Sequence, residues 1–100
     1  MMPAVAQPLV MLTLADYAGI TRARGVPADS FEAGKTCGWV PANMSLTTYD
    51  IIADPNPWGS AGDLRLAPDH SARYACWPTR AGTPLDMVMS DIVELDGSPW

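Results

Sequence analysis

The chain has 100 residues, of which 48% are hydrophobic and 17% are charged, and its net charge at pH 7 is −5. This length supports one domain with a single core, and this composition is that of a folded chain. The acidic balance excludes a nucleic-acid-binding surface, which needs a basic face. The apolar start, residues 1–15, lacks a basic segment, is interrupted by Pro3 and Pro8, and is too short to span a membrane. We therefore expect a cytoplasmic protein.

The first regular stretch predicts a β-hairpin. Residues 10–16 alternate between two faces in the manner of a strand. The sequence Asp16-Tyr-Ala-Gly19 predicts a turn, because glycine tolerates a positive φ. Residues 20–26 predict the returning strand, which ends at Pro27 because proline cannot donate to a ladder.

A short helix and a third strand are expected next. Residues 28–33 follow a proline and carry acidic side chains, which is typical of a helix start, and Gly34 or Gly38 would end this helix. Residues 43–49 predict a strand with alternating apolar positions. Residues 50–62 are rich in proline, glycine and aspartate, and they predict a loop.

The last part of the chain predicts three more strands. Residues 63–67, which end at Pro68, and residues 72–77 predict two short ones. Residues 79–84 predict a turn. Residues 85–95 form the longest apolar-rich run, and their apolar side chains lie on both faces, which indicates a strand inside the sheet.

This order of elements predicts an α+β fold. We expect a β-grasp, with a mixed sheet of about five to six strands and one short helix packed on it. A ferredoxin-like fold or a small barrel fits the periodicity alone equally well. Residues 1–9 would form an N-terminal tail, and residues 10–100 would form the domain.

The cysteines give no sign of a metal site. In an acidic chain without an export signal, we expect Cys37 and Cys76 to be reduced and partly buried. Together with His70 they lack the close ligand pair that zinc sites use, so we expect no bound metal.

Three segments carry a resemblance to a known family. They are Asp16-Tyr-Ala-Gly-Ile-Thr-Arg-Ala-Arg-Gly-Val-Pro27, Trp58-Gly-Ser-Ala-Gly-Asp-Leu-Arg-Leu-Ala-Pro-Asp69 and Ser90-Asp-Ile-Val-Glu-Leu-Asp-Gly-Ser-Pro-Trp100. In this order and spacing they resemble the N-terminal domain of the glutamine synthetase family, over most of the chain from about Val10 onward. The resemblance implies a β-grasp domain that completes the active site of a neighbouring subunit in a homo-oligomeric ring.

The resemblance also implies chemistry that this chain would not perform alone. Glutamine synthetases use ATP and Mg²⁺ or Mn²⁺ to phosphorylate the γ-carboxylate of glutamate, and ammonia or an amine then displaces phosphate. The family's ATP-binding and metal-binding residues lie in a C-terminal catalytic domain, which would begin where this sequence ends. We therefore expect a ligase of glutamine biosynthesis in the full-length protein. The 100-residue chain itself should be inactive and bind no cofactor.

The resemblance points to four candidate site residues. In classical members of the family, an aspartate on the loop that corresponds to residues 50–62 binds the ammonium ion. Asp50 is the first candidate, and Asp54 is the alternative, because the loop departs here from the family's Asp-Gly-Ser-Ser run. This departure leaves ammonia and larger amines open as nucleophiles. Trp58 resembles a tryptophan near the nucleotide, and Ser60 would shape the same loop. Turn and core roles stay open for these residues.

Other charged residues have simpler interpretations. Arg22 and Arg24 share a strand face and are expected to be solvated. Asp63 and Asp69 are expected to cap the ends of a strand. Asp91 lies in an apolar strand, so it should be paired or face an interface. The alternative function is a free-standing β-grasp module for interaction or oligomerisation, and an exposed apolar face would make the chain self-associate.

Overall fold

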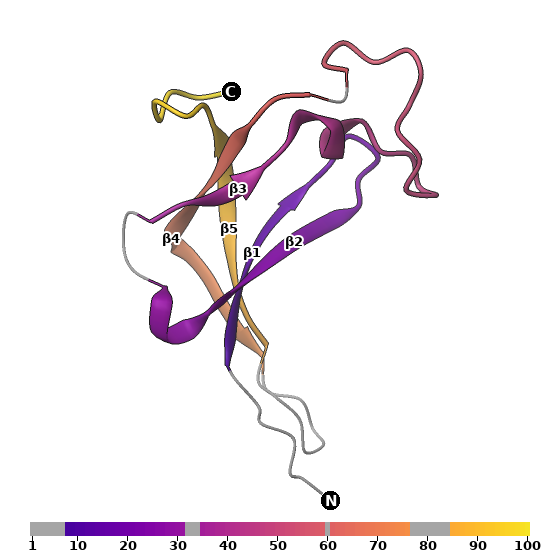
Figure 1. Ribbon diagram of the computed structural model, residues 1–100. Helices are drawn as coiled ribbons and strands as arrows, with labels where there is room; N and C mark the ends of the chain where they lie inside the picture. The colour runs from indigo at the N-terminus through magenta and orange to yellow at the C-terminus, as the bar shows by residue number, and fades with distance from the viewer. Residues whose placement is uncertain (1–7, 32–34, 60, 77–84) are drawn as a thin grey trace, which may run out of the picture.

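Five strands form one mixed sheet (Figure 1). The computed structural model describes residues 8–31, 35–59, 61–76 and 85–100. The strands are β1 (Leu9–Ala15), β2 (Thr21–Pro27), β3 (Cys37–Trp39), β4 (Leu64–Cys76) and β5 (Leu85–Val93), in the sheet order β2-β1-β5-β4-β3. Within the described residues, the only helical elements are two 3₁₀ turns, η1 (Ala28–Ser30) and η2 (Pro41–Ser45).

Strands β1 and β2 form the antiparallel hairpin that the sequence predicts. Leu14 lies opposite Arg22 near the turn. The turn closes where the N–H of Asp16 donates to the carbonyl of Ile20 at 3.0 Å. Gly19 has a φ of 78°, a value that disfavours other residues, so glycine suits this position. The hairpin prediction is confirmed.

Two neighbouring inner strands, β1 and β5, run parallel. Their register extends from Val10 opposite Asp86 to Thr13 opposite Met89. On its other side β5 pairs antiparallel with β4. Strand β5 is therefore an inner strand, as its apolar residues on both faces predicted.

The core lies on one face of the sheet, where alternate strand residues meet η2. Its buried cluster consists of Val10, Leu12, Leu14, Met44, Leu66 and Val88. Half-buried side chains that pack against this cluster include Phe31, Trp39, Trp58, Ile92 and Trp100. Burial of each aliphatic side chain in such a cluster contributes roughly 1.5–3 kcal/mol to folding.

The helix predicted over residues 28–33 is wrong for the part that the structure describes. Ala28–Ser30 form a single 3₁₀ turn, and Phe31 already has extended backbone, with φ −83° and ψ 109°. No residue of this turn is buried. A helix this short needs an apolar face packed against the core, and η1 has none. Residues 32–34 lie outside the described residues.

The strand predicted over residues 43–49 is also wrong. This segment begins in η2, where Pro41 fits the first helical position and Met44 is buried. Leu46 then makes only an isolated bridge to Ile52. The apolar spacing of Met44 and Leu46 predicted a strand, but Met44 lies in a 3₁₀ turn and Leu46 makes only one bridge. The third strand is instead the short β3.

The two strands predicted at residues 63–67 and 72–77 are in fact one strand, β4. It continues through Pro68, which lies opposite Ser90, and its register with β5 shifts between Pro68 and Arg73. A proline without an N–H is tolerated at such an irregularity. The turn predicted over residues 79–84 lies outside the described residues.

The predicted mixed sheet is confirmed, and its five strands lie within the predicted range of about five to six. The parallel pairing of β1 with β5 is consistent with a β-grasp. The short helix of that fold is missing from the described residues. The sheet curls nearly into a barrel, so that Arg24 of edge strand β2 donates from Nη1 to the carbonyl of Gly38 in the other edge strand, β3, at 2.9 Å. Within the described ranges no helix has the length and apolar character needed to cross a membrane.

Candidate functional site

Residues 46–59, called here the candidate loop, connect η2 to the segment before β4 and project from the sheet (Figure 1). The loop begins as a tight hairpin, in which Leu46 bridges Ile52. The N–H of Asp50 donates to the carbonyl of Thr47 at 3.0 Å, and Asp50 has a φ of 61°. Aspartate tolerates this left-handed conformation better than most residues, because its short polar side chain can bond locally.

Asp50 is held by an ion pair to the sheet. Nη1 of Arg22, on β2, lies 2.7 Å from Oδ1 of Asp50. The side chain of Asp50 is 72% exposed, whereas that of Arg22 is only 17% exposed. The expectation that Arg22 is a solvated strand residue is therefore wrong. Asp50 has a fixed cation on one side and solvent on the other.

Arg22 is held in turn by Asp16, whose side chain is 0% exposed. Asp16 accepts hydrogen bonds from Nε of Arg22 at 2.7 Å and from the N–H groups of Ala18 at 3.0 Å and Ile20 at 2.9 Å. The hydrogen bond from Arg22 is the main cause that lowers the pKa of Asp16, and it outweighs the opposing effect of burial. Hydrogen bonds to Asp16 and then to Asp50 raise the pKa of Arg22.

Asp54, the alternative candidate, has no such anchor. It precedes Pro55 through a cis peptide bond and is exposed. No hydrogen bond or ion pair between described residues involves its side chain. Beyond it the loop is ordered by Asn56, whose Nδ2 donates to the carbonyl of Ala53 at 3.0 Å and whose Oδ1 accepts from the N–H of Trp58 at 3.0 Å.

Trp58 belongs to an aromatic cluster of the domain itself. Its ring stacks on Tyr17, with centroids 5.5 Å apart and planes 10° apart. The ring of Trp100 meets it at 5.1 Å with planes 53° apart. Trp58 is half-buried against the core, so a contact with nucleotide could involve only its remaining exposed part. Ser60, the other predicted loop residue, lies outside the described residues.

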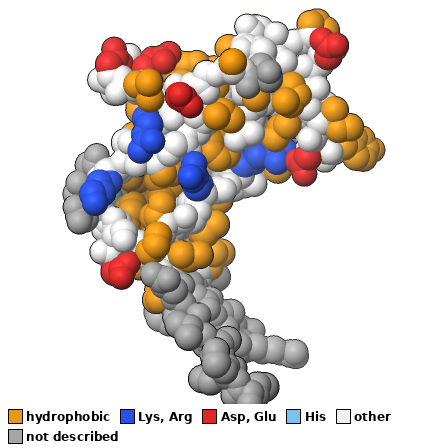
Figure 2. Space-filling model, in the orientation of Figure 1, with side chains coloured by type: hydrophobic (Ala, Val, Ile, Leu, Met, Phe, Trp, Pro, Cys, Tyr) orange, Lys and Arg blue, Asp and Glu red, His pale blue; other side chains and the backbone are white. Residues whose placement is uncertain are grey.

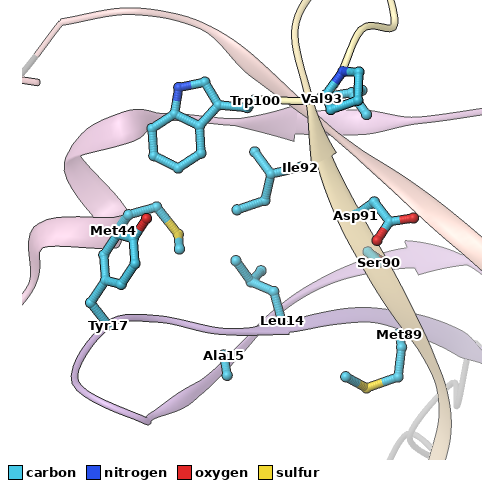
Figure 3. Close-up of a pocket in the computed structure, with 11 residues that line it drawn as sticks. Leu14, Ala15, Tyr17, Met44, Met89, Ser90, Asp91, Ile92, Val93 and Trp100 are labelled. Carbon is cyan, nitrogen blue, oxygen red and sulfur yellow. The ribbon is translucent and has the colours of Figure 1, made fainter.

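A hollow of about 600 Å³ opens beside this aromatic cluster. Figure 3 shows Tyr17, Met44, Ile92 and Trp100 gathered on one side of β5, with Asp91 on the other. Asp91, which was expected to be paired or to face an interface, is exposed at the rim. It makes no ion pair with a described residue, so the interface part of that expectation stays a prediction.

The tip of the candidate loop is apolar, which the sequence reasoning missed. Tyr49 is 85% exposed and Ile51 is 65% exposed. Figure 2 shows hydrophobic side chains at the projecting end of the molecule where this loop lies. The sequence did contain a signal for this apolar tip. Tyr49 precedes Asp50 and two isoleucines follow it, within a segment whose prolines and aspartates predict exposure.

The remaining candidates take structural positions. His70 contacts the ring of Phe31, with centroids 5.3 Å apart. Asp69 was expected to cap a strand end, and this is wrong: it lies inside β4, where the register with β5 shifts, and it accepts hydrogen bonds from the N–H and the hydroxyl of Ser71. Burial raises the pKa of the free Cys37 thiol. Within the described ranges, no three His, Cys, Asp or Glu side chains lie close enough together to hold a metal ion.

Comparison with known proteins places the chain in a family. The family model of the glutamine synthetase N-terminal domain matches residues 4–100. A solved structure described as a novel glutamine synthase homolog is 44% identical, with a TM-score of 0.88, over 100% of this chain and 24% of that one. None of the curated proteins matches the chain. The chain thus spans about a quarter of the length of that solved protein.

These matches define an N-terminal domain of the glutamine synthetase type. The chain belongs to the glutamine synthetase N-terminal domain family, which confirms the resemblance carried by its three sequence segments.

Proposed function

We propose that this chain is the N-terminal domain of an ATP-dependent ligase that joins ammonia or an amine to the γ-carboxylate of glutamate. The observation that carries this proposal is the family match over residues 4–100. The 44% identity to a glutamine synthase homolog supports it further. The full-length protein would act in nitrogen metabolism, as a cytoplasmic homo-oligomeric ring.

In this proposal the candidate loop completes the active site of a neighbouring subunit. Its apolar tip, with Tyr49 and Ile51, would exclude water when it is buried against that subunit. A carboxylate in such a surrounding attracts a cation strongly and can accept its proton. Asp50 would bind the ammonium or amine in this way, and Asp54 is the alternative. Trp58 would line the nucleotide end of the site with its exposed part.

We assign ATP and Mg²⁺ or Mn²⁺ to residues outside this domain. The described residues contain no group of three metal-ligating side chains, so they do not fit a metal ion by themselves. When bound, the metal and ATP would supply the phosphoryl transfer to glutamate. This domain's own contribution is to bind and orient the amine and to keep water out.

A free-standing interaction module is the second candidate. The exposed apolar tip at Tyr49 and Ile51 favours it, because such side chains commonly mark a protein-binding surface. Such a module would bind a partner through the loop without any turnover.

The proposal is tested with the full reading frame that encodes this domain. The assay measures phosphate release that depends on ATP, glutamate and either ammonium chloride or methylamine. The Asp50→Asn variant should raise the KM of the amine about tenfold, a loss of roughly 1.4 kcal/mol of binding. Asp29→Asn, in η1, is the matched control and should leave the KM unchanged. Absence of glutamate-dependent phosphate release would contradict the proposal and favour the interaction module.

A further inference from the structure

We infer that Arg22 is a positioning residue of the amine site: it aims the carboxylate of Asp50 from a buried anchor, Asp16. This inference rests on the proposed function, because it assumes that Asp50 meets the amine. It also decides between the two candidate aspartates in favour of Asp50 over Asp54.

The anchor is rigid. The carboxylate of Asp16 is fully buried and accepts three hydrogen bonds, two from backbone N–H groups of the β1–β2 turn and one from Nε of Arg22. Because two of these donors belong to the backbone of the hairpin, the carboxylate of Asp16 cannot turn without losing both bonds. The guanidinium of Arg22 is planar, so a bond at Nε also fixes the direction of Nη1.

The second end of the guanidinium fixes Asp50. Oδ1 of Asp50 lies 2.7 Å from Nη1 of Arg22, and the side chain of Asp50 is 72% exposed. One carboxylate oxygen is therefore held, and the other is available to a ligand. Asp54 has no side-chain partner among the described residues, so binding an amine there would also have to order its side chain, at a cost in entropy.

The charges of the cluster still suit a cation. Asp16, Arg22 and Asp50 carry formal charges of −1, +1 and −1, which sum to −1. Arg22 therefore does not neutralise the site, since its charge is already matched by Asp16. An incoming ammonium group would meet a net negative, pre-oriented carboxylate, and this pre-orientation is the contribution that we assign to Arg22.

The first experiment is a mutant cycle in the full-length protein, assayed by phosphate release with ammonium chloride and with methylamine. Arg22→Gln should raise the amine KM about fivefold and change kcat less than twofold. In the Asp50→Asn background, Arg22→Gln should have no further effect on KM. Arg24→Gln is the matched control, since it removes a guanidinium from the same strand face without touching Asp50.

A second variant guards against loss of folding. Arg22→Lys keeps the charge and can reach Asp16, but a single ammonium group cannot span both carboxylates in a planar fork. It should fold and show the same rise in KM. An unchanged or lowered KM in both Arg22 variants would overturn the inference. An equal rise in the Asp50→Asn background would overturn it too, because Arg22 would then act by another route.

The 100-residue chain gives a readout that needs no activity. In Arg22→Gln, amide hydrogen exchange at Asp50 should accelerate about fivefold, while exchange at Gly97, a turn amide that donates to Glu94, should not change. Unchanged exchange at Asp50 would overturn the inference while leaving the ligase proposal intact. Wild-type protein without any glutamate-dependent turnover would defeat the ligase proposal, and the inference with it, whatever the exchange result.

Discussion

The ring of Tyr17, in the β1–β2 turn, stacks on the ring of Trp58, in the candidate loop, with centroids 5.5 Å apart and planes 10° apart. Together with the Arg22–Asp50 ion pair, this contact ties the loop to the hairpin at two points. The loop is therefore held in place by the sheet although it lies outside the sheet.

Removal of the Trp58 ring should destabilise the domain. Trp58→Ala is expected to lower the free energy of unfolding by about 2 kcal/mol, less than for a fully buried tryptophan, because this ring is half-buried. Chemical denaturation of the 100-residue chain measures the change. Tyr49→Ala, at the exposed tip, is the control and should lie within about 0.5 kcal/mol of wild type. Equal stability of all three proteins would show that the stack does not hold the loop.

The core should respond more strongly than the loop. Leu66 is fully buried and lies opposite Cys37 on one side and Ile92 on the other. Leu66→Ala should lower the free energy of unfolding by about 3 kcal/mol, through lost burial and a residual cavity. Leu95→Ala is the control, because that side chain is 69% exposed. A loss below about 1 kcal/mol at Leu66 would contradict the packing described for this face.

Acid should weaken the domain through Asp16. The pKa of Asp16 is lowered in the folded state, so its contribution to stability is present above its unfolded pKa of about 4 and is lost as pH falls through the lower folded value. Asp16→Asn should therefore reduce stability at pH 7, and the difference from wild type should shrink below pH 4. Urea unfolding measured between pH 2 and pH 7 gives both curves. A constant difference across this range would contradict the Asp16–Arg22 pair as its source.

The parts of the fold that the sequence predicted are those governed by local pattern. Alternation over residues 10–16 and a turn with Gly19 specify a hairpin from neighbours alone, and apolar residues on both faces of β5 specify an inner strand. The failures arise where tertiary burial decides. The spacing of Met44 and Leu46 predicted a strand, but Met44 is buried against the sheet from the 3₁₀ turn η2.

The candidate site was predictable only in part. The family resemblance singled out Asp50 and Trp58, but no local pattern joins Asp50 to Arg22, 28 positions earlier. That contact depends on how the loop returns to the sheet, and the positive φ of Asp50 belongs to the same arrangement. The sequence predicted only a turn residue at Asp16, although its buried carboxylate anchors the Arg22–Asp50 pair.

The claim that this domain completes a neighbour's active site is tested most directly with mixed oligomers of the full-length protein. One variant replaces residues 47–52 by two glycines, and the other carries an inactivating change in the catalytic domain. Each should be inactive alone. After the two are unfolded together and reassembled, the mixture should regain glutamate-dependent phosphate release, because some sites combine an intact loop with an intact catalytic domain. A mixture as inactive as its parents would contradict the account.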